Sequence, residues 1–142
     1  MKIRPAVLSD DQCIASFNQA MALETEAKHL PDKVILAGVR RQLDDASLGF
    51  YLIAEDSGNA LGCLGITFEW SDWRCGLFWW IQSVYVDPDQ RNRGVFSNLY
   101  AEVKKLASQH DDVIGIRLYA EKENIRDFDG VFRIPLEFQQ MN

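Results

Sequence analysis

The chain has 142 residues, of which 47% are hydrophobic and 25% are charged, so it suits a single domain with one core. The net charge of −6 argues against a nucleic-acid partner and favours cationic partners, amines included. The sequence has neither a long apolar run nor a basic-then-apolar start, so we expect a cytoplasmic protein with no membrane partner.

The apolar residues and turn residues of the chain predict the element order β-α-α-β-β-β-α-β. The predicted strands cover 3–7, 50–55, 60–70, 77–86 and 114–121, and the predicted helices cover 9–27, 33–43 and 95–109. The unit 77–121 should be a parallel strand-helix-strand crossover. We therefore expect an α/β or α+β domain with a mixed sheet, followed by an edge strand over 131–138.

Metal binding is not indicated by the cysteines and histidines. Cys13, Cys63 and Cys75 are scattered and form no C-x-x-C pair, and neither His29 nor His110 is near one of them in sequence. We interpret the three cysteines as small apolar residues with reduced thiols, and we expect no metal.

The stretch VDPDQRNRGVF, residues 86–96, joins a predicted strand to a predicted helix. A helix start presents unpaired N–H groups and positive potential, and Gly94 lets an anion approach the backbone closely. Arg91 and Arg93 add charge, while Gln90 and Asn92 add donors. This pattern favours a phosphate site, although a basic helix start after an ordinary glycine turn explains it as well.

The longer segment VYVDPDQRNRGVFSNLYAEV resembles the acetyl-CoA motif of the GCN5-related N-acetyltransferase (GNAT) family, V-x-P-x-x-R-x-x-G-x-G/A. Val86, Pro88, Arg91 and Gly94 match in register, whereas Phe96 replaces the final Gly or Ala. The segments IRPAVLSDD, ALGCLGIT and LYAEKEN resemble three other parts of the family in the right order. The resemblance covers residues 1–125 and implies one domain over 1–142, a GNAT-like mixed, mostly antiparallel sheet with a splayed parallel pair around the acetyl-CoA site, flanked by helices.

The resemblance also implies that acetyl-CoA is the acetyl donor and suggests where it binds. Its pantetheine arm would pair with the backbone of Val84, Tyr85 and Val86. Its pyrophosphate would rest on the loop amides of Arg91, Asn92, Arg93, Gly94, Val95 and Phe96. Asn124, at the end of the strand in LYAEKEN, is implied in cofactor binding and catalysis.

Direct attack by an amine on the thioester needs a base, because an aliphatic ammonium is protonated at neutral pH. The candidates are Glu24, on the inner stripe of the first helix, Glu26, and Glu69 at the end of a strand. Each also fits an ordinary surface carboxylate, and a chain of water molecules would serve as well.

The acceptor is expected to be an organic cation, because Trp70, Asp72 and Trp73 flank a loop with two aromatic faces and a carboxylate. Glu24 is a further candidate substrate residue. The surrounding segment is similar to polyamine and diamine acetyltransferases, which carry an acidic pair where this chain has Gln82 and Ser83. This departure argues against a polyamine.

The C-terminal part departs from the family, whose next helix carries an A-x-x-x-Y pattern with a tyrosine that protonates the leaving thiolate. Asp127 and Val131 hold the alanine and tyrosine positions here. A truncated or frame-shifted relative, a homodimer whose last strand comes from a second copy, and a CoA-binding protein without turnover all explain this tail.

The sequence thus predicts an acetyl-CoA-dependent N-acetyltransferase that acts on a primary amine of a small molecule. The alternative is a CoA-binding protein with little or no catalysis. A third interpretation is an interaction module with no nucleotide site, for which Arg91 and Gly94 would be dispensable.

Overall fold

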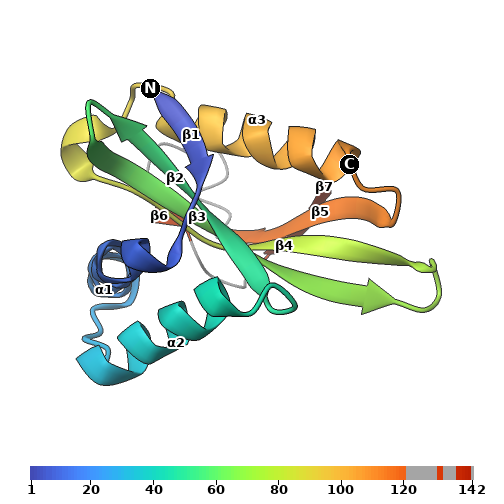
Figure 1. Ribbon diagram of the computed structural model, residues 1–142, viewed down its shortest axis with the longest axis horizontal. Helices are drawn as coiled ribbons and strands as arrows, with labels where there is room; N and C mark the ends of the chain where they lie inside the picture. Colours follow the sequence, from blue (N-terminus) through green and yellow to red (C-terminus); the bar gives the residue numbers. More distant parts are fainter. Residues whose placement is uncertain (121–130, 133–136, 142) are drawn as a thin grey trace.

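A mixed sheet forms the central layer of the structure, which is a computed structural model that describes residues 1–120, 131–132 and 137–141. Its strands are β1 (Lys2–Pro5), β2 (Gly49–Asp56), β3 (Asn59–Ser71), β4 (Gly76–Val86), β5 (Val113–Ala120), β6 (Val131–Phe132) and β7 (Glu137–Met141). Helices α1 (Asp11–Glu26) and α2 (Asp32–Asp44) cover one face, and α3 (Val95–Ser108) covers the other (Figure 1). The predicted order of elements up to β5 is confirmed.

The strands follow the order β1-β2-β3-β4-β5-β7, with β6 beside β4. Every pair of neighbours is antiparallel except β4 and β5, which are parallel. The sheet is therefore mixed and mostly antiparallel, as predicted. Within the described part of the chain, no helix combines the length and the apolar character that a membrane span requires.

Two cores lie on opposite faces of the sheet. On one face, Leu99 and Val103 of α3 join a cluster with Leu64 and Ile81 of the central strands. On the other face, Ile14 of α1 and Val39 of α2 pack with Ile53 and Cys63. Because both faces of the sheet are covered, the central strands bury the side chains that point to either face, which explains their nearly continuous apolar sequences.

The C-terminal strand predicted over 131–138 is wrong as a single element. The chain instead forms β6, which pairs with Val84 and Tyr85 of β4, and β7, which pairs with β5. Where β6 pairs, the parallel strands β4 and β5 have already separated. Each of them therefore has a free edge with which a C-terminal strand can pair. Residues 121–130 and 133–136 lie outside the described residues.

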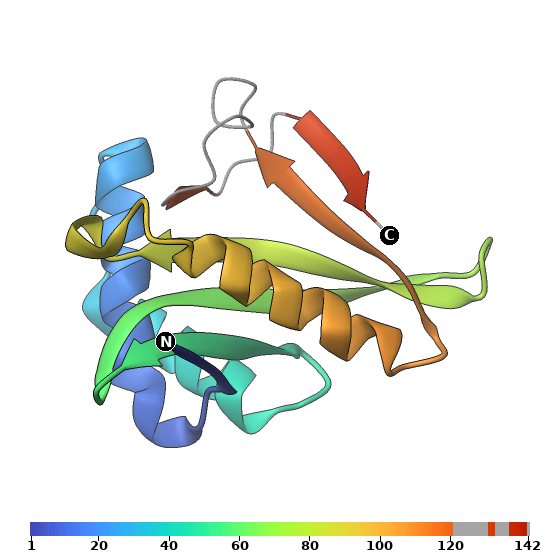
Figure 2. The same ribbon diagram turned by 90° about the horizontal axis from the view of Figure 1, so that it is seen from above.

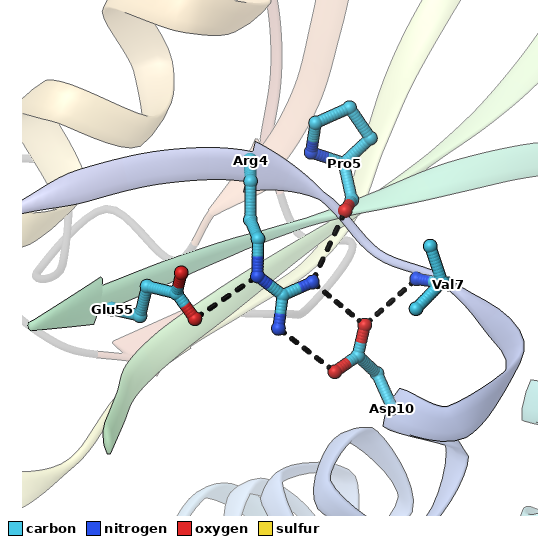
Figure 3. Close-up of polar contacts among 5 residues, drawn as sticks. All are labelled: Arg4, Pro5, Val7, Asp10 and Glu55. Atoms are coloured by element: carbon cyan, nitrogen blue, oxygen red, sulfur yellow. Dashed lines mark hydrogen bonds and ion pairs between the residues drawn. The ribbon is translucent and has the colours of Figure 1, made fainter. Parts of the chain in front are cut away.

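Arg4 ties β1 to β2 and to the start of α1 (Figure 3). Its Nε donates to Glu55 at 3.0 Å, and its Nη1 and Nη2 donate to the two oxygens of Asp10 at 2.8 and 2.9 Å. Asp10 also accepts the backbone N–H of Val7 at 2.7 Å. The hydrogen bonds from Arg4 hold the pKa of Asp10 below its usual value, although partial burial opposes them. This network anchors the helix that borders the cavity described below.

Asp10→Asn should lower the free energy of unfolding by about 2 kcal/mol at pH 7, because it removes a bidentate, charge-assisted pair. Since the folded-state pKa of Asp10 is depressed, its stabilisation is complete above the unfolded value of about 4 and is lost as the pH falls through the folded value. Urea denaturation at pH 7 and pH 3 should therefore show a smaller difference between parent and variant at pH 3. An equal difference at both pH values would contradict this role.

Candidate active site

The parallel strands β4 and β5 separate before β4 ends. Their pairing runs from Leu77 with Val113 to Ile81 with Leu118, whereas β4 continues to Val86. Figure 2 shows β5 diverging from β4 toward its C-terminal end. The separation exposes the backbone edge of β4 that the sequence assigned to a pantetheine arm. In this structure β6 pairs with Val84 and Tyr85 at that edge.

The loop after β4 leads directly into the N-terminus of α3. Asp87 accepts the amide of Asp89 at 3.0 Å and so caps the short 3-10 turn η2 (Pro88–Gln90), while Arg93 bonds the side chain of Gln90. Gly94 adopts φ +79° immediately before the helix, a left-handed conformation that favours glycine. The first amides of α3 therefore stand at the end of a turn with no intrahelical acceptor, the arrangement that binds phosphate elsewhere.

Phe96, which replaces the small residue of the motif, lies inside the protein rather than over the loop. Its side chain is buried and stacks on Tyr100, with ring centroids 6.0 Å apart. The departure at this position therefore fills the core and leaves the backbone of the loop uncovered by its side chain.

Arg91 points its guanidinium at α1. Its Nε donates to the Val86 carbonyl at 3.0 Å, and its two terminal nitrogens donate to the two oxygens of Glu24, each at 3.0 Å. The guanidinium also lies over the Tyr85 ring. Glu24 was predicted as a base or substrate residue, but both of its oxygens bind Arg91. We therefore interpret the pair as a link between α1 and the loop.

Glu24→Gln should weaken acetyl-CoA binding by about threefold to tenfold. The change removes the ion pair that fixes the loop before α3, so binding must then include the cost of ordering this loop. The value of kcat at saturating substrates should stay within about twofold of the parent. Calorimetric titration and steady-state kinetics measure the two effects. A drop of about 100-fold in kcat would instead assign Glu24 the role of the base.

A cavity of about 410 Å³ lies between α1, α2 and the sheet. The sheet contributes Tyr51, Thr67, Gln82 and Ser83, while α1, α2 and their connection contribute Asn18, Met21, Ala22, Thr25, Glu26, Leu30, Ile35 and Gln42. Gln82 and Ser83, two of the predicted substrate residues, therefore line this cavity. Glu26 is the only one of the three candidate bases among the described residues that line this cavity.

The other predicted substrate residues lie elsewhere. Trp70, Asp72 and Trp73 are exposed near the β3–β4 turn, with Trp73 92% exposed, and this turn projects away from α1 (Figure 1). Glu69 accepts hydrogen bonds from the Trp80 indole and from Arg117. The cation site expected from the loop is therefore not assembled at the cavity, because the long β3–β4 hairpin carries the loop past it. Asn124 lies outside the described residues.

Several residues of the cavity wall carry no recognisable signal in the sequence. Tyr51 comes from the strand predicted over 50–55, to which no site was assigned, and Thr67 and Gln42 carried no motif. Tyr51 is 7% exposed, and burial raises the pKa of its hydroxyl to about 12, so it is a proton donor near neutral pH. No local signal identifies such residues, because they meet only when β2, β3 and α2 pack together.

Comparison with known proteins agrees with this geometry. The Acetyltransferase (GNAT) family model matches residues 14–127. The crystal structure of a possible acetyltransferase from Clostridium difficile 630 is 42% identical, with a TM-score of 0.81 over 88% of this chain and 82% of that one. No curated protein sequence matches the chain.

More distant structures share the fold. A probable acetyltransferase is 17% identical, with a TM-score of 0.78 over 88% of this chain and 82% of that one. An aminoglycoside N-acetyltransferase solved in complex with CoA is 18% identical, with a TM-score of 0.72 over 96% of this chain and 92% of that one. With the family match over 14–127, the chain belongs to the GNAT acetyltransferase family.

Proposed function

We propose that this acetyltransferase transfers the acetyl group of acetyl-CoA to a primary amine of a small molecule. The observation that carries the proposal is the position of β4. Its residues Gln82 and Ser83 line the cavity, and the same strand runs on to Val86 and the loop before α3. A donor held along this strand and an acceptor held in the cavity would therefore meet at adjacent residues.

The donor site consists of the β4 edge and the loop. The amides from Arg91 to Phe96 would bind the pyrophosphate, and the backbone of Val84 to Val86 would pair with pantetheine. The N–H near Val84 would polarise the thioester carbonyl. The carrier would have to replace β6, which pairs with β4 through only two residues. The relative solved with CoA supports the choice of carrier.

The acceptor site supplies the base. Glu26 faces the cavity, and its carboxylate would take a proton from the ammonium, directly or through one water molecule. The neutral nitrogen then attacks the acetyl carbon, the N–C bond forms and the C–S bond breaks. The CoA thiolate leaves, and the second proton that the attacking nitrogen releases as the amide forms passes through water to this thiolate, which gives the CoA thiol.

The test is calorimetric titration with acetyl-CoA, followed by measurement of thiol release over a panel of amines. We expect saturable binding and amine-dependent release. Binding without release for any amine would support the alternative, a CoA-binding protein without turnover. Absence of binding would contradict both.

The cellular setting and the assembly belong to this proposal as well. We propose that the protein acts in the cytoplasm. A homodimer through the C-terminal strand stays a prediction, since β7 has a single neighbour, β5, in the strand order of the described residues.

A further inference from the structure

Tyr51, Gly65 and Ser83 lie side by side on three neighbouring strands. Tyr51 of β2 pairs with Gly65 of β3, which pairs with Ser83 of β4. A Cβ atom at position 65 would lie 2.8 Å from Cε1 of Tyr51 and 3.0 Å from Oγ of Ser83. Glycine in the middle strand therefore leaves the space in which the tyrosine ring and the serine hydroxyl come together.

Both hydroxyl-bearing residues face the cavity from an almost buried position. Tyr51 is 7% exposed and Ser83 is 9% exposed, and both line the cavity wall. Within the part of the chain that the structure describes, neither hydroxyl makes a hydrogen bond to another residue. Because buried polar groups usually find partners, these two hydroxyls are available to the polar groups of a bound molecule.

The charge of the wall restricts what this molecule can be. Glu26 is the only charged side chain among the described residues that line the cavity, and the polar remainder consists of amides and hydroxyls. None of the described lining residues is cationic, and Lys28, whose ammonium lies 3.5 Å from the Glu26 carboxylate, is an exposed residue outside this lining. A ligand carboxylate or phosphate would lose its hydration against the wall without gaining a cationic partner from the lining, which is costly. An ammonium would face Glu26 instead.

We infer that the acceptor is a hydroxylated amine without carboxylate or phosphate groups, such as an amino alcohol or an amino sugar, and that Tyr51 and Ser83 determine this specificity by binding its hydroxyl groups. The inference rests on the proposed function, because it names the acceptor class of the same cavity.

Three small amines of nearly equal size test the inference. Serinol carries two hydroxymethyl groups, serine replaces one of them by a carboxylate, and isopropylamine replaces both by methyl groups. We expect kcat/KM for serinol to exceed that for serine by about 100-fold, because a buried, unpaired charge is strongly disfavoured. Glucosamine and glucosamine 6-phosphate should differ in the same direction. Equal rates for the charged and uncharged members of both pairs would overturn the inference.

Variants at the two hydroxyl-bearing residues distinguish the loss of a hydroxyl contact from a general loss of activity. Tyr51→Phe and Ser83→Ala should each reduce kcat/KM for serinol about tenfold more than for isopropylamine, because each removes one hydrogen-bonding group. Equal reductions for both amines would contradict the assigned roles. Asn18→Lys adds a cation to the wall and should reduce the preference for serinol over serine about tenfold. An unchanged preference would place the acceptor outside this cavity.

Failure of the inference differs from failure of the proposed function. If amines are acetylated but serine reacts as well as serinol, the function stands and the acceptor class is wrong. If no amine releases thiol, the function is wrong, and titration of serinol and serine into the CoA-bound protein then tests the cavity alone. Binding of serinol but not serine would support the selectivity of the cavity, and equal binding or no binding of both would overturn it.

Discussion

Gly94→Asp should weaken acetyl-CoA binding by at least about 100-fold. Gly94 precedes the first amides of α3 and has φ +79°. Aspartate tolerates this left-handed conformation better than most residues, and a carboxylate at a helix N-terminus interacts favourably with the helix dipole. A Cβ atom at this position would meet only Asn98 Nδ2 within 4 Å among the described residues, at 3.6 Å. The variant should therefore fold, while its charge occupies and repels the position of the pyrophosphate.

Gly94→Asn is the matched control, because asparagine has nearly the same shape and the same tolerance of positive φ but carries no charge. We expect its affinity for acetyl-CoA to remain within about tenfold of the parent, as measured by calorimetric titration. Equal affinity of both variants and the parent would place the phosphate site elsewhere. Equal loss in both variants would show that backbone shape, rather than charge, controls binding.

Glu26→Gln should lower kcat at pH 7 by about 100-fold or more, which is the usual contribution of a general base. The affinity for acetyl-CoA should be unchanged, because Glu26 lies on the cavity side of α1 and not on the loop. Raising the pH increases the fraction of neutral amine, whose pKa is about 10, so the activity of the variant should rise toward that of the parent in alkaline solution.

The chain offers two matched controls for this experiment, Glu24→Gln and Glu69→Gln. Glu24 lies on the same helix but binds Arg91, and Glu69 binds Trp80 and Arg117. Thiol-release kinetics from pH 6 to pH 10 should show the large, pH-dependent loss in Glu26→Gln alone. A loss of the same size in either control, or none in Glu26→Gln, would assign proton removal to another group.

The candidate bases show where local patterns stop being informative. The helical spacing after Met21 predicted Glu24 on the inner stripe of α1, whereas the structure leaves Glu24 exposed with a partner, Arg91, that is 67 residues away in sequence. That separation hides the ion pair from any local pattern. Glu26 lines the cavity together with Met21, Ala22 and Thr25 of the same helix, and the cavity exists only because α2 and the sheet pack beside them.

The tryptophans show the same limit for strands. The aromatic sequence over 77–86 correctly predicted a covered central strand, and Trp79 packs with Phe50 and Phe68 inside the core. Trp70 and Trp73 were predicted to form a binding site for an organic cation. The β3–β4 hairpin is long because its strands stay paired, and it therefore carries these two tryptophans to its turn, away from the cavity.

The sequence by itself determined the order of helices and strands up to β5, the glycine turn before α3 and the family, because each depends on residues close together in the chain. The tertiary structure alone decided which groups meet at the cavity. Tyr51, Gly65 and Ser83 come together through the register of three strands, and Arg91 reaches Glu24 only after α1 packs against the end of β4. Such contacts depend on pairing between distant segments, and a one-residue change of register in β2 or β4 would turn the side chain of Tyr51 or Ser83 to the opposite face of the sheet.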